Sequence, residues 1–203
     1  MQLNNLKNMN NMTKTVALSI LTVLVVLAVG IGLFKLSENA VPFVPVKDPN
    51  ELVGKPMPHM NLTDKEDKSF DWDSIKNKKT VLFFNEGLMC YPACWDQMAA
   101  FGKDERYNSA TAAAVSVITD MPSEWDTAIK KMPDLAKAIT MFDSEAKNSK
   151  LLGLLSVASS MHMGRSLGHT YVLIDQSGIV REVIDDPNMA VNNDKIWEKL
   201  NQY

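Results

Sequence analysis

The chain of 203 residues has only two cysteines, no run of lysine or arginine, and no internal repeat. Two cysteines are too few to staple a small domain, and a separation of four positions points to chemistry rather than to architecture. The absence of a basic run argues against a nucleic acid partner. The sequence also lacks a phosphate loop, a dinucleotide fingerprint and a serine-centred nucleophile motif, so it does not indicate nucleotide-dependent or serine-hydrolase chemistry.

What is present is the composition of an ordinary globular protein, with 46% hydrophobic and 22% charged residues. That balance does not suit a disordered chain, and the length fits one domain of ordinary size plus a tail. The formal net charge is −3, yet residues 1–40 hold three lysines against one glutamate. The excess negative charge therefore lies in the remainder of the chain.

A long uncharged stretch covers residues 16–34. A helix needs roughly 20 apolar residues to cross the hydrocarbon core of a bilayer, whereas the apolar core of a signal peptide is about 7–15 residues long. We therefore predict that this stretch is a retained membrane anchor. A signal peptide cleaved near Ala40 is the alternative, and in either case the folded part is exported.

Lys7 and Lys14 precede the apolar stretch, so the positive-inside tendency leaves the N-terminus in the cytoplasm. Three prolines within residues 40–49 indicate a stiff, extended spacer after the anchor. The predicted organisation is a protein of the cell membrane in four parts: a cytoplasmic tail (1–13), a transmembrane helix (14–36), a linker (37–50) and an extracytoplasmic domain (51–203).

Strand-like and helix-like stretches alternate along the outer domain. Short apolar runs with β-branched or aromatic residues predict buried strands, and the stretches between them predict helices. A hairpin with a glycine turn and an amphipathic helix close the chain. The predicted strands are 80–84, 114–119, 139–142, 170–175 and 179–184, and the predicted helices are 92–103, 123–132, 146–155 and 194–202. This order predicts an α/β fold with a central mixed sheet flanked by helices.

Two segments carry a family resemblance. Residues 53–87 read VGKPMPHMNLTDKEDKSFDWDSIKNKKTVLFFNEG, and residues 168–183 read GHTYVLIDQSGIVREV. The first is similar to the G-K-x-x-P loop, L-T-D turn and V-L-x-F strand that open AhpC/TSA-type redoxin domains. The second resembles the C-terminal hairpin of the same domains. The resemblance covers about residues 51–202 and implies the thioredoxin-like fold.

Cys90 and Cys94 lie between a predicted strand and a helix whose first position suits Pro92. A thiolate near a helix N-terminus is stabilised by unpaired N–H groups and by the positive end of the helix dipole, which lowers its pKa. We predict that Cys90, nearer the exposed loop, is the nucleophile and that Cys94 is the resolving thiol. The alternative is a fixed disulfide or two unreactive thiols.

The resemblance implies an antioxidant or thiol-redox role without a cofactor. It also locates where peroxiredoxins carry a proline, a threonine and an arginine, and this chain has Phe83, Gly87 and His169 there. We therefore predict a thiol–disulfide oxidoreductase rather than an efficient peroxidase, with His169 as a third site residue beside the dithiol. The expected partners are the membrane and a thiol or disulfide of a protein, a small thiol or a peroxide.

The alternative function is a copper carrier. Cys90, Cys94 and His169 also resemble the ligand set of the Sco copper chaperones, although Trp95 stands where that family has a proline. Two thiolates and one imidazole suit copper. Beyond these residues, Glu86 is either a proton acceptor or a solvated loop residue, and residues 161–163 (Met-His-Met) form either a soft-metal handle or an exposed loop.

Overall fold

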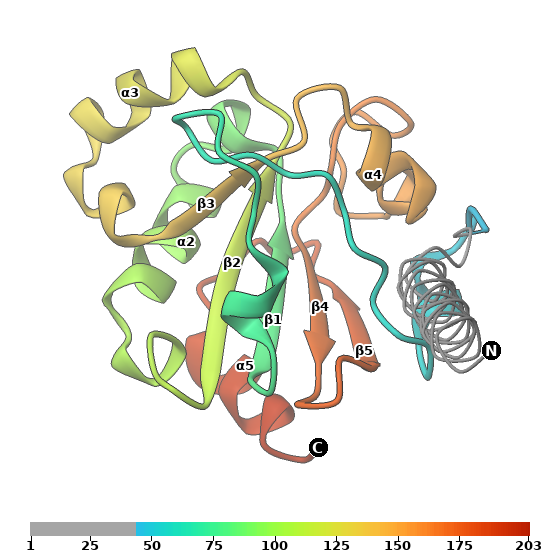
Figure 1. Cartoon of the computed structure of the whole chain (residues 1–203). Coiled ribbons are helices and arrows are strands. Elements are labelled where there is room, and N and C mark those ends of the chain that lie inside the picture. Colours follow the sequence, from blue (N-terminus) through green and yellow to red (C-terminus); the bar gives the residue numbers. More distant parts are fainter. Residues whose placement is uncertain (1–43) are drawn as a thin grey trace, which may run out of the picture. The chain divides into compact units, whose positions relative to one another are not determined.

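The structure, a computed structural model, describes residues 44–203 (Figure 1). The tail predicted for residues 1–13, the membrane helix predicted for 14–36 and the linker residues 37–43 lie outside the described residues. Between Val44 and Tyr203, no helix has the length and apolar character needed to cross a bilayer.

A five-stranded mixed sheet forms the centre of the domain, in the order β3-β2-β1-β4-β5 (Figure 1). β1, β2 and β3 are parallel to one another, β4 pairs antiparallel with β1, and β5 pairs antiparallel with β4. The strands are β1 (Lys79–Phe84), β2 (Ala112–Ile118), β3 (Ile139–Phe142), β4 (Thr170–Ile174) and β5 (Val180–Asp185). The predicted α/β, thioredoxin-like fold is confirmed.

The inner strands are apolar along their length because both faces of the sheet are covered. Val81 and Phe83 point into the main hydrophobic core, and the alternate residues Leu82 and Phe84 are fully buried as well. The edge strand β3 differs, because only Phe142 in it is buried. There the backbone of Thr63 exchanges two hydrogen bonds with that of Phe142 and closes part of the edge.

Residues 44–203 form four α-helices, and the core on one face of the sheet joins residues of α2, α5, β1 and β4. In α5, Ile196 and Leu200 are fully buried, as its predicted apolar side requires. The helices are α2 (Ala93–Lys103), α3 (Pro122–Lys131), α4 (Lys147–Leu151) and α5 (Asn193–Leu200).

The helix predicted over residues 146–155 is wrong in length. α4 ends at Leu151, and Gly153 adopts a φ of +71° before a 3-10 turn at Leu154–Ser156. A side chain at Gly153 would also meet the carbonyl oxygen of Lys47 at 2.8 Å. Glycine therefore ends the helix here, because only glycine adopts this left-handed conformation readily at so close a backbone contact.

Candidate functional site

The site lies in the turn that joins the end of β1 to the start of α2. After β1, a 3-10 helix (η3, Gly87–Cys90) leads directly into α2. The backbone N–H of Leu88 donates to Asp120 Oδ2 at 3.1 Å, and the indole of Trp95 donates to the carbonyl of Gly87 at 2.9 Å. The turn is thus held from both sides, by the end of β2 and by the first turn of α2.

Cys90 and Cys94 form a disulfide, with their Cα atoms 5.3 Å apart. Cys90 is the last residue of η3, and Cys94 lies in the first turn of α2. Both are buried, with 4% of Cys90 and none of Cys94 exposed. So small a difference in exposure does not rank the two thiols, and their order stays a prediction.

His169 lies directly before β4, at the point where that strand runs beside the end of β1. Because Phe84 pairs with Thr170, the imidazole reaches the start of α2, and its Nδ1 lies 3.5 Å from Cys94 Sγ. The ring is fully buried and packs edge-on against Phe83. Burial lowers the pKa of His169 to about 4, so the imidazole is neutral near pH 7.

The three residues predicted from the sequence therefore meet in space. The two sulfur atoms and one imidazole nitrogen all lie within 4.8 Å of one another. In the oxidised form the sulfurs are bonded to each other, and reduction turns them into two thiols beside a neutral imidazole. Such a set can exchange disulfides, and its thiolates and imidazole also fit a soft ion such as copper(I).

Tyr171 and Gln97 belong to the site, and the sequence analysis missed both. Nε2 of His169 lies 2.8 Å from the phenolic oxygen of Tyr171, which donates to Gln97 Oε1 at 3.0 Å. A signal for each was present in the spacing. Tyr171 is two positions from His169 on a strand, and Gln97 is three positions from Cys94 on a helix, so each shares a face with its site residue.

The interpretation of Glu86 as a solvated loop residue is wrong. The residue is 4% exposed, and its Oε1 accepts a hydrogen bond from the backbone N–H of Met161 at 3.1 Å. His162 Nδ1 lies 3.8 Å from the same oxygen. Oε2 is buried and has no hydrogen-bond partner within residues 44–203. Glu86 therefore ties the loop that carries Met161 to the turn before Cys90.

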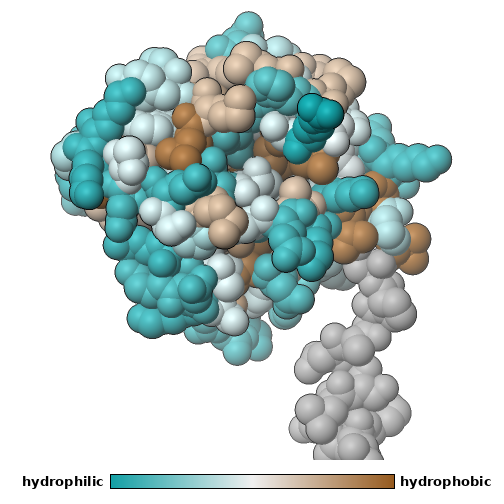
Figure 2. All heavy atoms as spheres, turned by 90° about the horizontal axis from the view of Figure 1, so that it is seen from above, coloured by the Kyte–Doolittle hydropathy of each residue, from teal (hydrophilic) through white to brown (hydrophobic). Residues whose placement is uncertain are grey.

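The surface around the disulfide carries exposed apolar side chains. Figure 2 looks down on the end of the domain at which β1 and β2 finish, and hydrophobic side chains lie there between hydrophilic ones. Met89 and Tyr91, on either side of Cys90, are 61% and 49% exposed. The ammonium of Lys131 lies 3.5 Å from the centre of the Tyr91 ring, which brings a positive charge against the side chain that follows Cys90 in the sequence.

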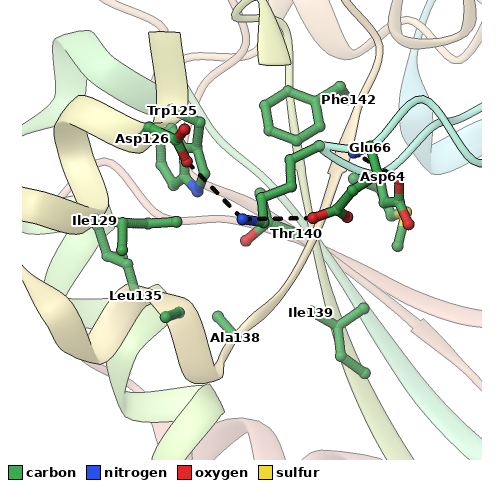
Figure 3. Close-up of a pocket in the computed structure, with 13 residues that line it drawn as sticks. Asp64, Glu66, Trp125, Asp126, Ile129, Leu135, Ala138, Ile139, Thr140 and Phe142 are labelled. Carbon is green, nitrogen blue, oxygen red and sulfur yellow. Dashed lines mark hydrogen bonds and ion pairs between the residues drawn. The ribbon is translucent and has the colours of Figure 1, made fainter. Parts of the chain in front are cut away.

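A pocket of about 370 Å³ lies elsewhere, against the edge strand β3 and helix α3 (Figure 3). Its wall includes the apolar side chains of Trp125 and Ile129. Lys65 pairs with both Glu66 and Asp126 beside it. Neither cysteine nor His169 lines this pocket, so it is separate from the thiol site.

Asp120 makes the site region sensitive to pH. Burial raises the pKa of its carboxyl to about 6, although the N–H of Leu88 favours the charged form. Its pKa in the unfolded chain is about 3.9. The folded protein therefore binds more protons between about pH 4 and 6, and the free energy of unfolding falls as the pH rises through that window.

We expect Asp120→Asn to remove this component of the pH dependence, because an amide does not titrate and its oxygen still accepts from Leu88. The free energy of unfolding, measured by urea titration from pH 4 to 7, will fall less with rising pH than in the wild type. Asp73→Asn, at a carboxylate that is 86% exposed, is the matched control. His169 has the opposite effect, because its lowered pKa makes the free energy of unfolding decrease as the pH falls below 6.5. This effect is the same in the wild type and in both variants. Parallel profiles for Asp120→Asn and the wild type would contradict the assignment.

Comparison with known proteins identifies the sequence family. The model of the family described as Redoxin matches residues 52–196. No curated protein matches the chain.

Several solved structures share the fold. A peroxiredoxin-like protein from Aquifex aeolicus is 18% identical, with a TM-score of 0.58 over 74% of this chain and 86% of that one. A PrxQ mutant from Xylella fastidiosa is 15% identical, with a TM-score of 0.60 over 74% of this chain and 95% of that one. A putative protein disulfide isomerase from Bacteroides thetaiotaomicron is 18% identical, with a TM-score of 0.52 over 74% and 86%. At these identities the likeness concerns the fold alone.

Proposed function

Because the chain belongs to the redoxin family, we propose that it is a membrane-anchored, extracytoplasmic thiol–disulfide oxidoreductase that works through Cys90 and Cys94. The observation that carries the proposal is the disulfide at the start of α2, with a neutral imidazole against its inner sulfur. A cysteine pair at a helix N-terminus is suited to reversible exchange, because the helix end stabilises a thiolate.

In the proposed reaction, the thiolate of Cys90 attacks a partner disulfide, forms a mixed disulfide and releases the first partner sulfur as a thiolate. Cys94 then attacks the sulfur of Cys90, so the mixed disulfide breaks and the second partner sulfur leaves. Two electrons pass from the dithiol to the partner, and the protein ends with the Cys90–Cys94 disulfide. The same steps run in reverse when a partner dithiol reduces the protein.

We favour a thiol or disulfide of a partner protein, or a small thiol, over a peroxide as the substrate. Phe83 is fully buried in the core, and Gly87 has no side chain, so neither offers a polar group to a peroxide. At the remaining peroxiredoxin position His169 is neutral, and it supplies no positive charge near pH 7.

The anchor is proposed on the sequence, from the uncharged stretch at residues 16–34 and the lysines before it. This proposal would place the redox domain on the outer side of the cell membrane. Recovery of the protein from the soluble extracytoplasmic fraction, with an N-terminus near residue 40, would contradict it.

The function is tested by equilibrating the full-length protein, in detergent, with glutathione buffers of stepped potential. We expect one reversible two-electron couple, and in the reduced protein we expect alkylation to modify Cys90 first, with a thiolate pKa below about 8.5. Slow and equal labelling of both cysteines, with no equilibration, would leave only a structural disulfide.

The copper alternative is separated in the same experiment by His169→Ala. The comparisons do not support a copper carrier, so we expect the variant to keep measurable exchange with a shifted potential. A carrier would lose one of three ligands and bind copper(I) much more weakly. Stoichiometric copper(I) binding by the wild type that is lost in His169→Ala, in a protein without exchange activity, would overturn the oxidoreductase proposal.

A further inference from the structure

A line of hydrogen bonds runs from Cys94 through the interior to helix α5. It passes from the sulfur to His169, from there to Tyr171, and from Tyr171 to Gln97 on the next turn of α2. Beyond Gln97 it reaches Asn193, at the first residue of α5, where Gln97 Nε2 donates to Asn193 Oδ1 at 2.8 Å. Cys94, His169, Tyr171 and Gln97 show no solvent exposure.

The contacts of Asn192 and Asn193, at the α5 end of this line, set the directions of its hydrogen bonds. Asn193 Nδ2 donates to the carboxylate of Asp104 at 2.9 Å, so its Oδ1 must face Gln97. The backbone N–H of Asn192 donates to Gln97 at 2.7 Å, so the atom that it meets is the amide oxygen. One donor, the N–H of Asn192, and one acceptor, Asn193 Oδ1, thus set the orientation of the Gln97 amide, with its oxygen towards Tyr171.

The orientation of Gln97 decides which nitrogen of His169 carries the proton. The Tyr171 hydroxyl faces two oxygens that only accept, Gln97 Oε1 at 3.0 Å and the carbonyl of Ala190 at 3.5 Å. Donation of its single proton to Nε2 would leave the 3.0 Å contact with Gln97 Oε1 without a hydrogen, so the arrangement favours donation to Gln97, with the hydroxyl oxygen accepting from Nε2–H of His169. In the neutral ring Nδ1 then holds the lone pair, and this is the nitrogen that faces Cys94 Sγ.

Resting on the proposed function, we propose that Tyr171 and Gln97 are positioning residues for disulfide exchange, which fix His169 as the Nε2–H tautomer so that Nδ1 takes the proton of the Cys94 thiol. In this assignment a different group favours the thiolate form of each cysteine. The N-terminus of α2 serves Cys90, which lies just before the helix, whereas Cys94, with no exposed surface, depends on the imidazole.

The proton and the electrons balance in the resolving step. With a partner sulfur bonded to Cys90, the S–H proton of Cys94 moves to Nδ1 of His169 as the Cys94 sulfur attacks Cys90 Sγ. The Cys90–partner bond breaks as the Cys90–Cys94 bond forms, and the partner sulfur leaves with the electron pair. The departing thiolate takes up the proton from the imidazolium, which restores the neutral ring. Nε2–H donates to Tyr171 throughout, so the line of hydrogen bonds does not change.

The test compares Tyr171→Phe with Tyr107→Phe. Tyr107 is equally buried, and its hydroxyl donates to the backbone carbonyl of Asn193 at 2.7 Å, but it makes no hydrogen bond to His169. Each change removes one buried phenolic hydroxyl. We expect nitrogen NMR of the oxidised proteins to show the Nε2–H tautomer of His169 in the wild type and in Tyr107→Phe, and a mixture of tautomers in Tyr171→Phe.

The kinetic readout is the resolving step itself. Oxidised protein treated with excess glutathione forms a mixed disulfide on Cys90, and its decay after removal of glutathione is followed by acid quench and mass spectrometry. We expect Tyr171→Phe to slow this decay on the order of tenfold. That is less than the roughly 10²–10⁴-fold contribution of a whole general base, because His169 is still present. The first step, attack on the protein disulfide, stays near the wild-type rate in Tyr107→Phe.

A second pair of variants keeps the proposal testable if Tyr171→Phe fails to fold. Gln97→Glu loses the donor to Asn193 Oδ1 but retains oxygens that accept from Tyr171 and from Asn192, whereas Gln97→Met removes those oxygens as well, so the second should disturb the tautomer and slow resolution more than the first. A wild-type ring with its proton on Nδ1, or equal behaviour of Tyr171→Phe and Tyr107→Phe, would overturn the proposal. If the wild type does not react with glutathione at all, the proposed function is wrong. The NMR measurement would still show whether Tyr171 and Gln97 fix the tautomer of His169.

Discussion

Cys90→Ser will reduce disulfide exchange to the uncatalysed background, whereas Cys94→Ser will keep the first step and accumulate a mixed disulfide on Cys90. A serine hydroxyl is not a comparable nucleophile at neutral pH, so the variant at Cys90 cannot begin the reaction. The variant at Cys94 can begin it, but no second sulfur is present to release the partner. The measurement is the mass of the protein after reaction with a disulfide such as oxidised glutathione.

Stability provides the control for this pair of variants. Each substitution removes the same disulfide, which closes a loop of only a few residues and contributes about 2 kcal/mol by the loop-entropy relation. Both variants should therefore lose similar free energy of unfolding relative to the oxidised wild type, while their reactions differ. A stable adduct on Cys94 in Cys90→Ser, with none on Cys90 in Cys94→Ser, would reverse the roles of the two thiols.

Gly87→Ala will destabilise the protein by about 3 kcal/mol. Gly87 has a φ of +59°, a conformation that costs a residue with a side chain roughly 1–2 kcal/mol. A Cβ atom there would also lie 1.6 Å from Asp120 Oδ2. Relief of that overlap adds roughly 1–3 kcal/mol, and it must push the Asp120 carboxylate away from the N–H of Leu88.

Gly54→Ala separates these two contributions. Gly54 has a φ of +83°, but a Cβ atom at that position would have no neighbour within 4 Å. We expect it to lose only about 1 kcal/mol, from the backbone conformation alone. Urea unfolding of both variants at one pH measures the difference. Equal losses would mean that the contact between the turn and Asp120 does not support the site.

The sequence predicts the parts of this fold that depend on local patterns. The apolar run at β1, the glycine turn between β4 and β5 and the amphipathic α5 each carry their own signal, and each lies close to its predicted place. The helix predicted through Gly153 fails because its end is set by a close backbone contact with Lys47, about a hundred residues away in the sequence.

Family resemblance and residue spacing predicted the part of the site that consists of the two cysteines and His169. The cysteine pair at a helix start needed only the local pattern, and the meeting of His169 with Cys94 followed the resemblance. The burial of Glu86 could not be read, because its partner, the backbone of Met161, is brought to it by the tertiary fold alone. The register between β1 and β4, which aligns Phe84 with Thr170, likewise has no signature within either strand.

Because β1 pairs with β4, the two parts of the site differ in the free energy that local opening of the backbone requires. The two strands are joined along Thr80–Phe84 and Thr170–Ile174 in the middle of the sheet, so their amide protons can exchange with solvent only when much of the domain opens. The turn at η3 has no strand neighbour and is held by a backbone bond of 3.4 Å from Met89 to Glu86 and by the bonds to Asp120 and Trp95, so we expect it to open at a lower free energy than the strands. We therefore expect slow amide exchange in β4, next to His169, and faster exchange in the turn that holds Cys90, so that a rearrangement on reduction would involve the cysteine side.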